Sequence, residues 1–121
     1  MNTEDVPFFL SKRVPALASV INEAVDHLKR TYGAEVPMSD YIFGAVLAPL
    51  VSRMLRSHDQ NDRSTLASLF AALEELLDDP NPNMADMVFV SFLEQLSQDI
   101  EDWERAQAYM GERLRKEAHL P

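Results

Sequence analysis

Apolar residues recur at intervals of three and four along almost the whole chain, which is the spacing of one face of an α-helix. One of the clearest stripes consists of Leu66, Leu69, Phe70, Leu73, Leu76 and Leu77. The pattern predicts an all-α protein without a sheet. Because 121 residues are an ordinary length for one domain, we expect a single compact bundle of five or six helices spanning residues 1–121.

Prolines, glycines and polar stretches mark where these helices end. The expected helices cover residues 7–13, 15–32, 39–55, 64–77, 83–96 and 100–118. Pro49 lies inside the third of them, and a proline there predicts a kink or a break over 45–49 because it removes a backbone donor. The polar stretch 57–63 is the predicted linker between two halves, 1–56 and 64–121. The two prolines within 78–83 predict a tight, HEAT-like helical hairpin in the C-terminal half.

Negative charge is concentrated in the second half of the chain. Between positions 74 and 104 there are ten acidic residues and no lysine or arginine. The whole chain has a net charge of -9 and an isoelectric point near 4.6. Such a surface serves either solubility or the steered capture of a basic partner. It argues against nucleic acid as a partner, because contacts with phosphates need clustered basic residues.

Several classes of functional site lack their residues in this sequence. There is no cysteine, so a disulfide or a thiolate metal site is excluded. The three histidines are scattered, the pair Glu23 and His27 fits an ordinary surface contact on one helix, and the isolated glycines form no phosphate-binding loop. We therefore expect no enzyme activity, no cofactor and no metal. Because the N-terminus has no signal-peptide pattern and no segment is apolar enough for a membrane span, we expect a soluble cytoplasmic protein.

Two neighbouring segments carry a resemblance to a known family. They are Leu73–Asn83, with the sequence LEELLDDPNPN, and Val88–Leu96, with the sequence VFVSFLEQL. Together they resemble the small all-helical immunity proteins of bacterial contact-dependent inhibition and polymorphic-toxin systems. The resemblance implies a protein that binds and neutralises a cognate toxin domain. A nuclease is the expected toxin, because a cleft that holds phosphates is basic and fits an acidic surface.

The candidate contact surface combines the acidic residues on either side of the predicted hairpin with one tryptophan. Its members are Glu74, Glu75, Asp78, Asp79, Asp99, Glu101, Asp102, Trp103 and Glu104. For each carboxylate the alternative is an ordinary solvated helix face. For Trp103 the alternative to an aromatic anchor is the buried stripe of the last helix, since its spacing to Ala106 and Met110 fits that stripe.

A second class of function is compatible with the same composition. An acidic helical adaptor or secretion-type chaperone would bind a protein client through an exposed apolar groove. The sequence shows no obvious second hydrophobic face, which favours the immunity protein. The neighbouring upstream reading frame should discriminate between the two. The end of a very large secreted protein there would indicate immunity, and secretion machinery or its effector would indicate an adaptor.

Overall fold

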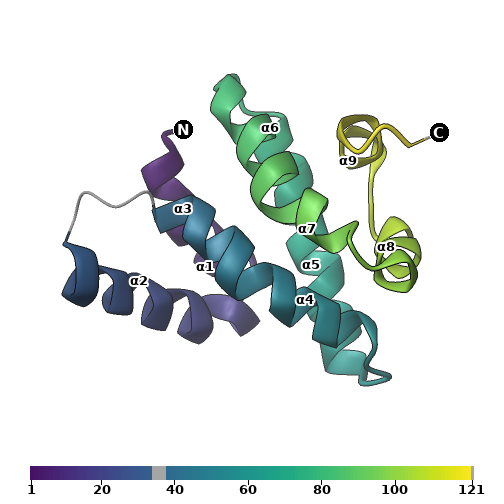
Figure 1. Cartoon of the computed structure of the whole chain (residues 1–121), viewed down its shortest axis with the longest axis horizontal. Helices are drawn as coiled ribbons and strands as arrows, with labels where there is room; N and C mark the ends of the chain where they lie inside the picture. The colour runs from purple at the N-terminus through teal and green to yellow at the C-terminus, as the bar shows by residue number, and fades with distance from the viewer. Residues whose placement is uncertain (34–37, 121) are drawn as a thin grey trace.

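Helices account for all regular secondary structure in residues 1–33 and 38–120, which are the residues that the computed structural model describes (Figure 1). The all-α prediction is confirmed. The segments are η1 Thr3–Asp5, α1 Val6–Arg13, η2 Pro15–Leu17, α2 Ala18–Tyr32, α3 Met38–Tyr41, η3 Ile42–Leu47, α4 Ala48–Leu55, α5 Gln60–Leu77, α6 Pro82–Val88, η4 Phe89–Leu93, α7 Glu94–Leu96, α8 Ile100–Gln107 and α9 Glu112–Glu117. The segments η1 and η2 are 3₁₀ turns, whereas η3 and η4 are π-helical.

Segments that follow one another without a gap, such as α3, η3 and α4, form one continuous helix. Counted in this way, the described part of the chain forms seven helices rather than five or six. The difference lies at the C-terminus, where one helix was expected over 100–118. The chain leaves α8 at Ala108 and begins α9 after Gly111. Gly111 is the N-cap of α9 and offers no side chain to bind the first amides, so the break depends on a contact from elsewhere in the fold.

The predicted linker 57–63 is too long. Helix α5 begins at Gln60, because the side chain of Asp59 caps it by accepting a hydrogen bond from the amide of Asn61 at 2.7 Å. The two halves of the chain also share one hydrophobic core. Buried residues of both halves, such as Leu10, Phe43 and Leu73, belong to the same cluster.

Pro49 does not break its helix. Segments α3, η3 and α4 follow one another without interruption (Figure 1). In the π-helical turn before it, the amide of Ala48 donates to the carbonyl of Phe43, five residues back. Pro49 then falls in the first turn of α4, where the missing amide proton costs least. The π-helical turn therefore accommodates Pro49 without the predicted break.

The two π-helical segments pack against each other in the middle of the molecule. The ring of Phe92 in η4 lies edge-on to Phe43 in η3, with 5.8 Å between ring centroids, and edge-on to Phe70 in α5 at 6.0 Å. Gly44 faces η4 at close range: a Cβ at that position would lie 3.4 Å from the carbonyl oxygen of Ser91, and Nε2 of Gln95 would have to move away from it. The packing fixes α4 and α7, which directly follow η3 and η4, beside each other.

Candidate functional site

A pocket of about 290 Å³ lies where α4 faces the end of α7 and the start of α8. Pro49 and Ser52 of α4, together with Arg56 directly after its last residue, form one wall. The amide side chains of Gln95 and Gln98 form part of the opposite wall. Both walls begin directly after a π-helical segment, because η3 ends at residue 47 and η4 at residue 93.

The most buried charged group of the described residues also lines this pocket. The side chain of Asp102 in α8 is only 2% exposed. Nε of Arg56 donates to its Oδ1, and Nη2 of Arg56 donates to its Oδ2, both at 3.0 Å. The hydroxyl of Ser52 donates to the same Oδ2. Arg105 adds a longer contact at 3.4 Å, so the carboxylate is fully paired and joins α8 to α4.

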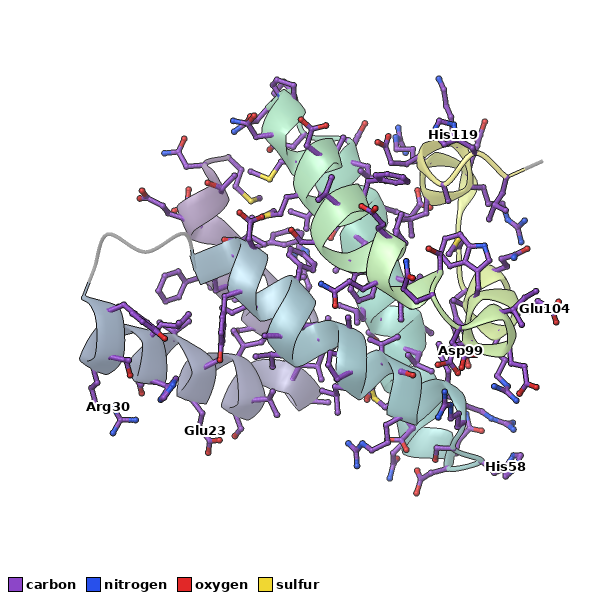
Figure 2. All side chains as sticks on the ribbon, viewed as in Figure 1. Glu23, Arg30, His58, Asp99, Glu104 and His119 are labelled. Carbon is purple, nitrogen blue, oxygen red and sulfur yellow. The ribbon has the colours of Figure 1, made fainter. Side chains whose placement is uncertain are left out.

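Asp99, the residue before α8, also belongs to this network. Its Oδ1 accepts from the amide of Asp102 at 3.0 Å and thereby caps α8, and its Oδ2 accepts from Nη2 of Arg56 at 3.2 Å. Unlike Asp102, it remains half exposed. Figure 2 shows Asp99 and Glu104 on the same side of the molecule, away from Glu23 on α2.

The network determines how its charged groups titrate. Burial raises the pKa of Asp102, but the hydrogen bonds from Arg56 and Ser52 and the nearby positive charges outweigh burial, so that the pKa is lowered overall. The pKa of Arg56 is raised, chiefly by its hydrogen bond to Asp102. Asp102 is therefore an ionised hydrogen-bond acceptor near neutral pH and is poorly suited to donate a proton in catalysis.

Four of the predicted contact residues gather at the C-terminal end of α5 and the turn that follows. Glu75 pairs with Arg13 at 2.8 Å, and Asp78 pairs with Arg113 at 2.9 Å. The sequence between 74 and 104 has no basic residue, but the fold brings in arginines from α1 and α9. The predicted one-signed surface is therefore largely compensated here.

The other two members of this group have structural contacts as well. Asp79 binds the terminal ammonium group of Met1 at 3.2 Å and accepts from the amide of Asn81. Its pKa is lowered, first by the bond from Asn81 and also by the ammonium group, against the effect of burial. Glu74 accepts from the amides of Arg113 and Leu114 at 3.2 and 3.0 Å and caps α9.

We predict that Glu74→Ala will lower the free energy of unfolding by about 1 kcal/mol, because α9 then loses the cap that Gly111 cannot supply. Glu75→Ala is the matched control. It removes a neighbouring carboxylate whose ion pair is exposed, and its cost should stay below about 0.5 kcal/mol. Urea unfolding of both variants measures the difference. Equal stability of the two variants would contradict the capping role.

The remaining predicted residues lie on α8 or at its start. Glu101 is exposed and pairs with Arg105 at 3.5 Å, whereas Glu104 is exposed and has no ion pair among the described residues. Asp102 is buried, so its carboxylate is held inside the fold. Trp103 is partly buried and packs against the core. The structure thus brings Asp99, Glu101 and Glu104 to one edge of the molecule.

Several residues of this region were not predicted from the sequence as part of a site. Ser52 and Arg56 were assigned only to a helix and its end, and their pairing with a carboxylate 46 to 50 positions later has no local signal. Ile100 is the most exposed large apolar side chain described, at 73%, and directly precedes Glu101. An isoleucine at the first position of a polar helix was the available signal for it.

The described residues contain neither a metal-binding group nor a membrane-spanning helix. Among residues 1–33 and 38–120 there is no group of three His, Cys, Asp or Glu side chains placed to hold a metal ion. In the same residues, no helix combines the length and apolar character that crossing a membrane requires. The pocket beside Asp102 combines apolar lining residues, Ala48, Pro49 and Leu96, with side chains that offer hydrogen bonds and charge.

Comparison with known proteins gives one finding. No curated protein and no solved structure matches the chain. A family model does match it, over residues 9–119, and its description is "Domain of unknown function (DUF7674)". Because the match covers nearly the whole sequence, the chain belongs to the DUF7674 family.

Proposed function

We propose that this protein is an immunity protein, which binds a cognate toxin domain and neutralises it through the exposed edge of α8. The observation that carries the proposal is the composition of that edge. A largely exposed isoleucine, Ile100, stands beside three exposed carboxylates, those of Asp99, Glu101 and Glu104. A large apolar side chain among charges is typical of a binding hot spot with a polar rim.

Electrostatics supports a basic partner. Three carboxylates in this region, those of Asp99, Glu101 and Asp102, share the two guanidinium groups of Arg56 and Arg105, and Glu104 has no ion pair among the described residues. An excess of negative charge therefore remains at the edge of α8, on a protein whose net charge is -9. Such a field raises the association rate with a basic surface above the roughly 10⁵ to 10⁶ M⁻¹s⁻¹ of an unsteered encounter. A nuclease toxin, with a cleft built to hold phosphates, has such a surface.

The acidic group at the end of α5 has a smaller part in this proposal. Glu74, Glu75, Asp78 and Asp79 are engaged with arginines, amides or the chain terminus. A partner would have to displace these contacts before it gained new ones. The resemblance of segments 73–83 and 88–96 to immunity proteins supports the class of function, and the edge of α8 supplies the contact surface.

Co-expression tests the proposed function. The probe is the C-terminal domain encoded by the neighbouring upstream reading frame, produced in a host that it poisons. We expect the protein to restore growth by forming a stable complex. If instead the client is harmless and the protein merely keeps it soluble, the function is that of an adaptor or chaperone and the proposal fails.

Charge reversal at the edge of α8 tests the surface. With the neutralised toxin domain as partner, Glu101→Lys combined with Glu104→Lys should lower the association rate constant at least tenfold at low salt, because two charges change sign and the local charge shifts by four units towards repulsion. It should also flatten the dependence of that rate on ionic strength. Glu23→Lys on α2 is the matched control, since it changes charge away from α8 (Figure 2). Equal rates for the control and the double variant would contradict the surface.

A further inference from the structure

The two π-helical segments of the described residues lead into one place. Of the pocket residues, Pro49 comes two positions after η3 ends, and Gln95 comes two positions after η4 ends. Segments of π-helix are rare and interrupt regular α-helical hydrogen bonding, and they are frequently found at functional sites. Two such segments in contact, each leading into a wall of the same pocket, indicate that the pocket is a binding site.

Size limits what the pocket can hold. Its volume of about 290 Å³ lies at the lower end of the roughly 300 to 1,000 Å³ of small-molecule sites. A nucleotide or a large cofactor would not fit within it, whereas one long side chain would. The pocket also adjoins the edge of α8, since Asp99 belongs to both.

Charge limits the occupant further. Arg56 is the cation among the pocket residues, and its Nε and Nη2 already donate to Asp99 and Asp102. An anion would therefore meet a guanidinium group that two carboxylates have neutralised. Asp102 also contacts Arg105, so the half-exposed Asp99, which shares Arg56 with it, is the pocket carboxylate with the least compensation, and its charge favours a cation.

Unused acceptors are available in the same place. Nε2 of Gln98 donates to the carbonyl of Glu94 at 3.1 Å, which leaves Oε1 of Gln98 to accept a hydrogen bond. The oxygens of Asp99 each accept one bond, and a carboxylate oxygen has a second lone pair. Gln95, above Gly44, adds an exposed amide. Several acceptors spread around one cavity match the planar, five-donor fork of a guanidinium group better than the point charge of an ammonium group.

We propose that the pocket between α4, α7 and α8 receives one arginine side chain of the protein partner, bound by Asp99, Gln95 and Gln98. The inference rests on the proposed function and adds to it the identity of an anchoring residue on the partner. Ile100 and the carboxylates of α8 then surround that anchor, as an interface rim surrounds its central contact.

Nuclear magnetic resonance of the ¹⁵N-labelled full chain tests the pocket without the partner. The probe is N-acetyl-arginine methylamide, and the matched controls are the lysine analogue and the citrulline analogue, which has the shape of arginine without its charge. We expect saturable shifts of the side-chain amide signals of Gln95 and Gln98 with arginine, weaker ones with lysine and none with citrulline. Equal shifts with citrulline or lysine, or shifts spread over the whole acidic surface, would overturn the proposal.

One substitution isolates the charge. Asp99→Asn should weaken binding of the arginine analogue about tenfold or more, a loss of at least about 1.4 kcal/mol, while asparagine still caps α8. Asp59→Asn is the matched control, because it makes the same change at the cap of α5, outside the pocket. It should bind like the unchanged protein. Unchanged affinity in Asp99→Asn, with the fold intact by circular dichroism, would contradict the proposal.

The two proposals can fail separately. If the pocket inference is wrong, growth rescue by co-expression persists in Asp99→Asn and the arginine analogue gives no specific shifts. If the immunity function is wrong, the upstream domain is not neutralised by any variant, although the pocket still binds the analogue.

Discussion

Replacing Phe92 with alanine should lower the free energy of unfolding by about 4 kcal/mol, which is within the range of about 3 to 5 kcal/mol for a phenylalanine removed from a core. Phe92 is fully buried, and its ring makes edge contacts with both Phe43 and Phe70. Alanine would remove those contacts and leave a cavity between η3, η4 and α5. Since a domain of this size has a total stability of about 5 to 15 kcal/mol, the variant loses a large part of it.

The matched control lies on the same π-helical segment. Val90 is 57% exposed, and Val90→Ala should change the free energy of unfolding by less than about 0.5 kcal/mol. Urea unfolding followed by circular dichroism measures both variants. A loss below about 2 kcal/mol for Phe92→Ala would mean that the π-helical segments can rearrange to fill the cavity, contrary to the packing described above.

The helical period predicted the helices themselves well. The apolar stripes of α2 and α5 mark faces that are buried in the structure, and the prolines within 78–83 and Gly33 mark true helix ends, unlike Pro49. These signals are local, because they depend on neighbours three or four positions away. They fail at the C-terminus, where α9 is separated from α8 and capped by Glu74, nearly forty positions earlier.

The π-helical segments have no such local signal. Apolar residues at helical spacing look the same whether the turn holds an α or a π bond pattern, so 42–47 and 89–93 were expected to be ordinary helix. Pro49 was recognised as incompatible with a regular helix. The structure accommodates it by the π-helical turn η3, which packs against η4, and such a contact between distant segments has no local sequence signal.

The sequence alone also could not predict which acidic residues are paired with arginines in the fold. Ten carboxylates without a basic neighbour in sequence suggested one continuous negative surface. The fold pairs Glu75 with Arg13 and Asp78 with Arg113, across 62 positions in the first case. Charge in sequence therefore overstated charge in space at the end of α5, whereas the edge of α8 keeps an excess.

Replacing Asp102 with asparagine should be the most costly change of a polar residue. The carboxylate is almost completely buried, and Arg56 and Ser52 both donate to it. Asparagine keeps the shape but loses the charge, and its amide group would face a donor. A hydrogen bond to a charged group contributes about 1.5 to 3 kcal/mol, and Arg56 can partly recover by turning to water, so we expect a loss of about 2 kcal/mol.

Acid should remove the difference in the free energy of unfolding between the unchanged protein and Asp102→Asn. Because the pKa of Asp102 is lower in the folded chain than in the unfolded chain, the unfolded chain takes up its proton first as the pH falls. The contribution of Asp102 is complete above the unfolded value of about 3.9 and is lost as the pH falls through the folded pKa. The stability gap between the unchanged protein and Asp102→Asn should stay constant from about pH 7 to 5 and shrink below about pH 4.

Urea unfolding at pH 7, 5 and 3 measures this gap. Glu101→Gln is the matched control, because it neutralises an adjacent carboxylate that is 75% exposed, and its effect should be below about 0.5 kcal/mol at each pH. A gap that widened in acid would mean that Asp102 is protonated in the fold, contrary to its pairing with Arg56. Because that pairing holds α8 against α4, Asp102→Asn should also loosen the pocket wall on which Asp99 stands, and binding of the arginine analogue should weaken together with stability.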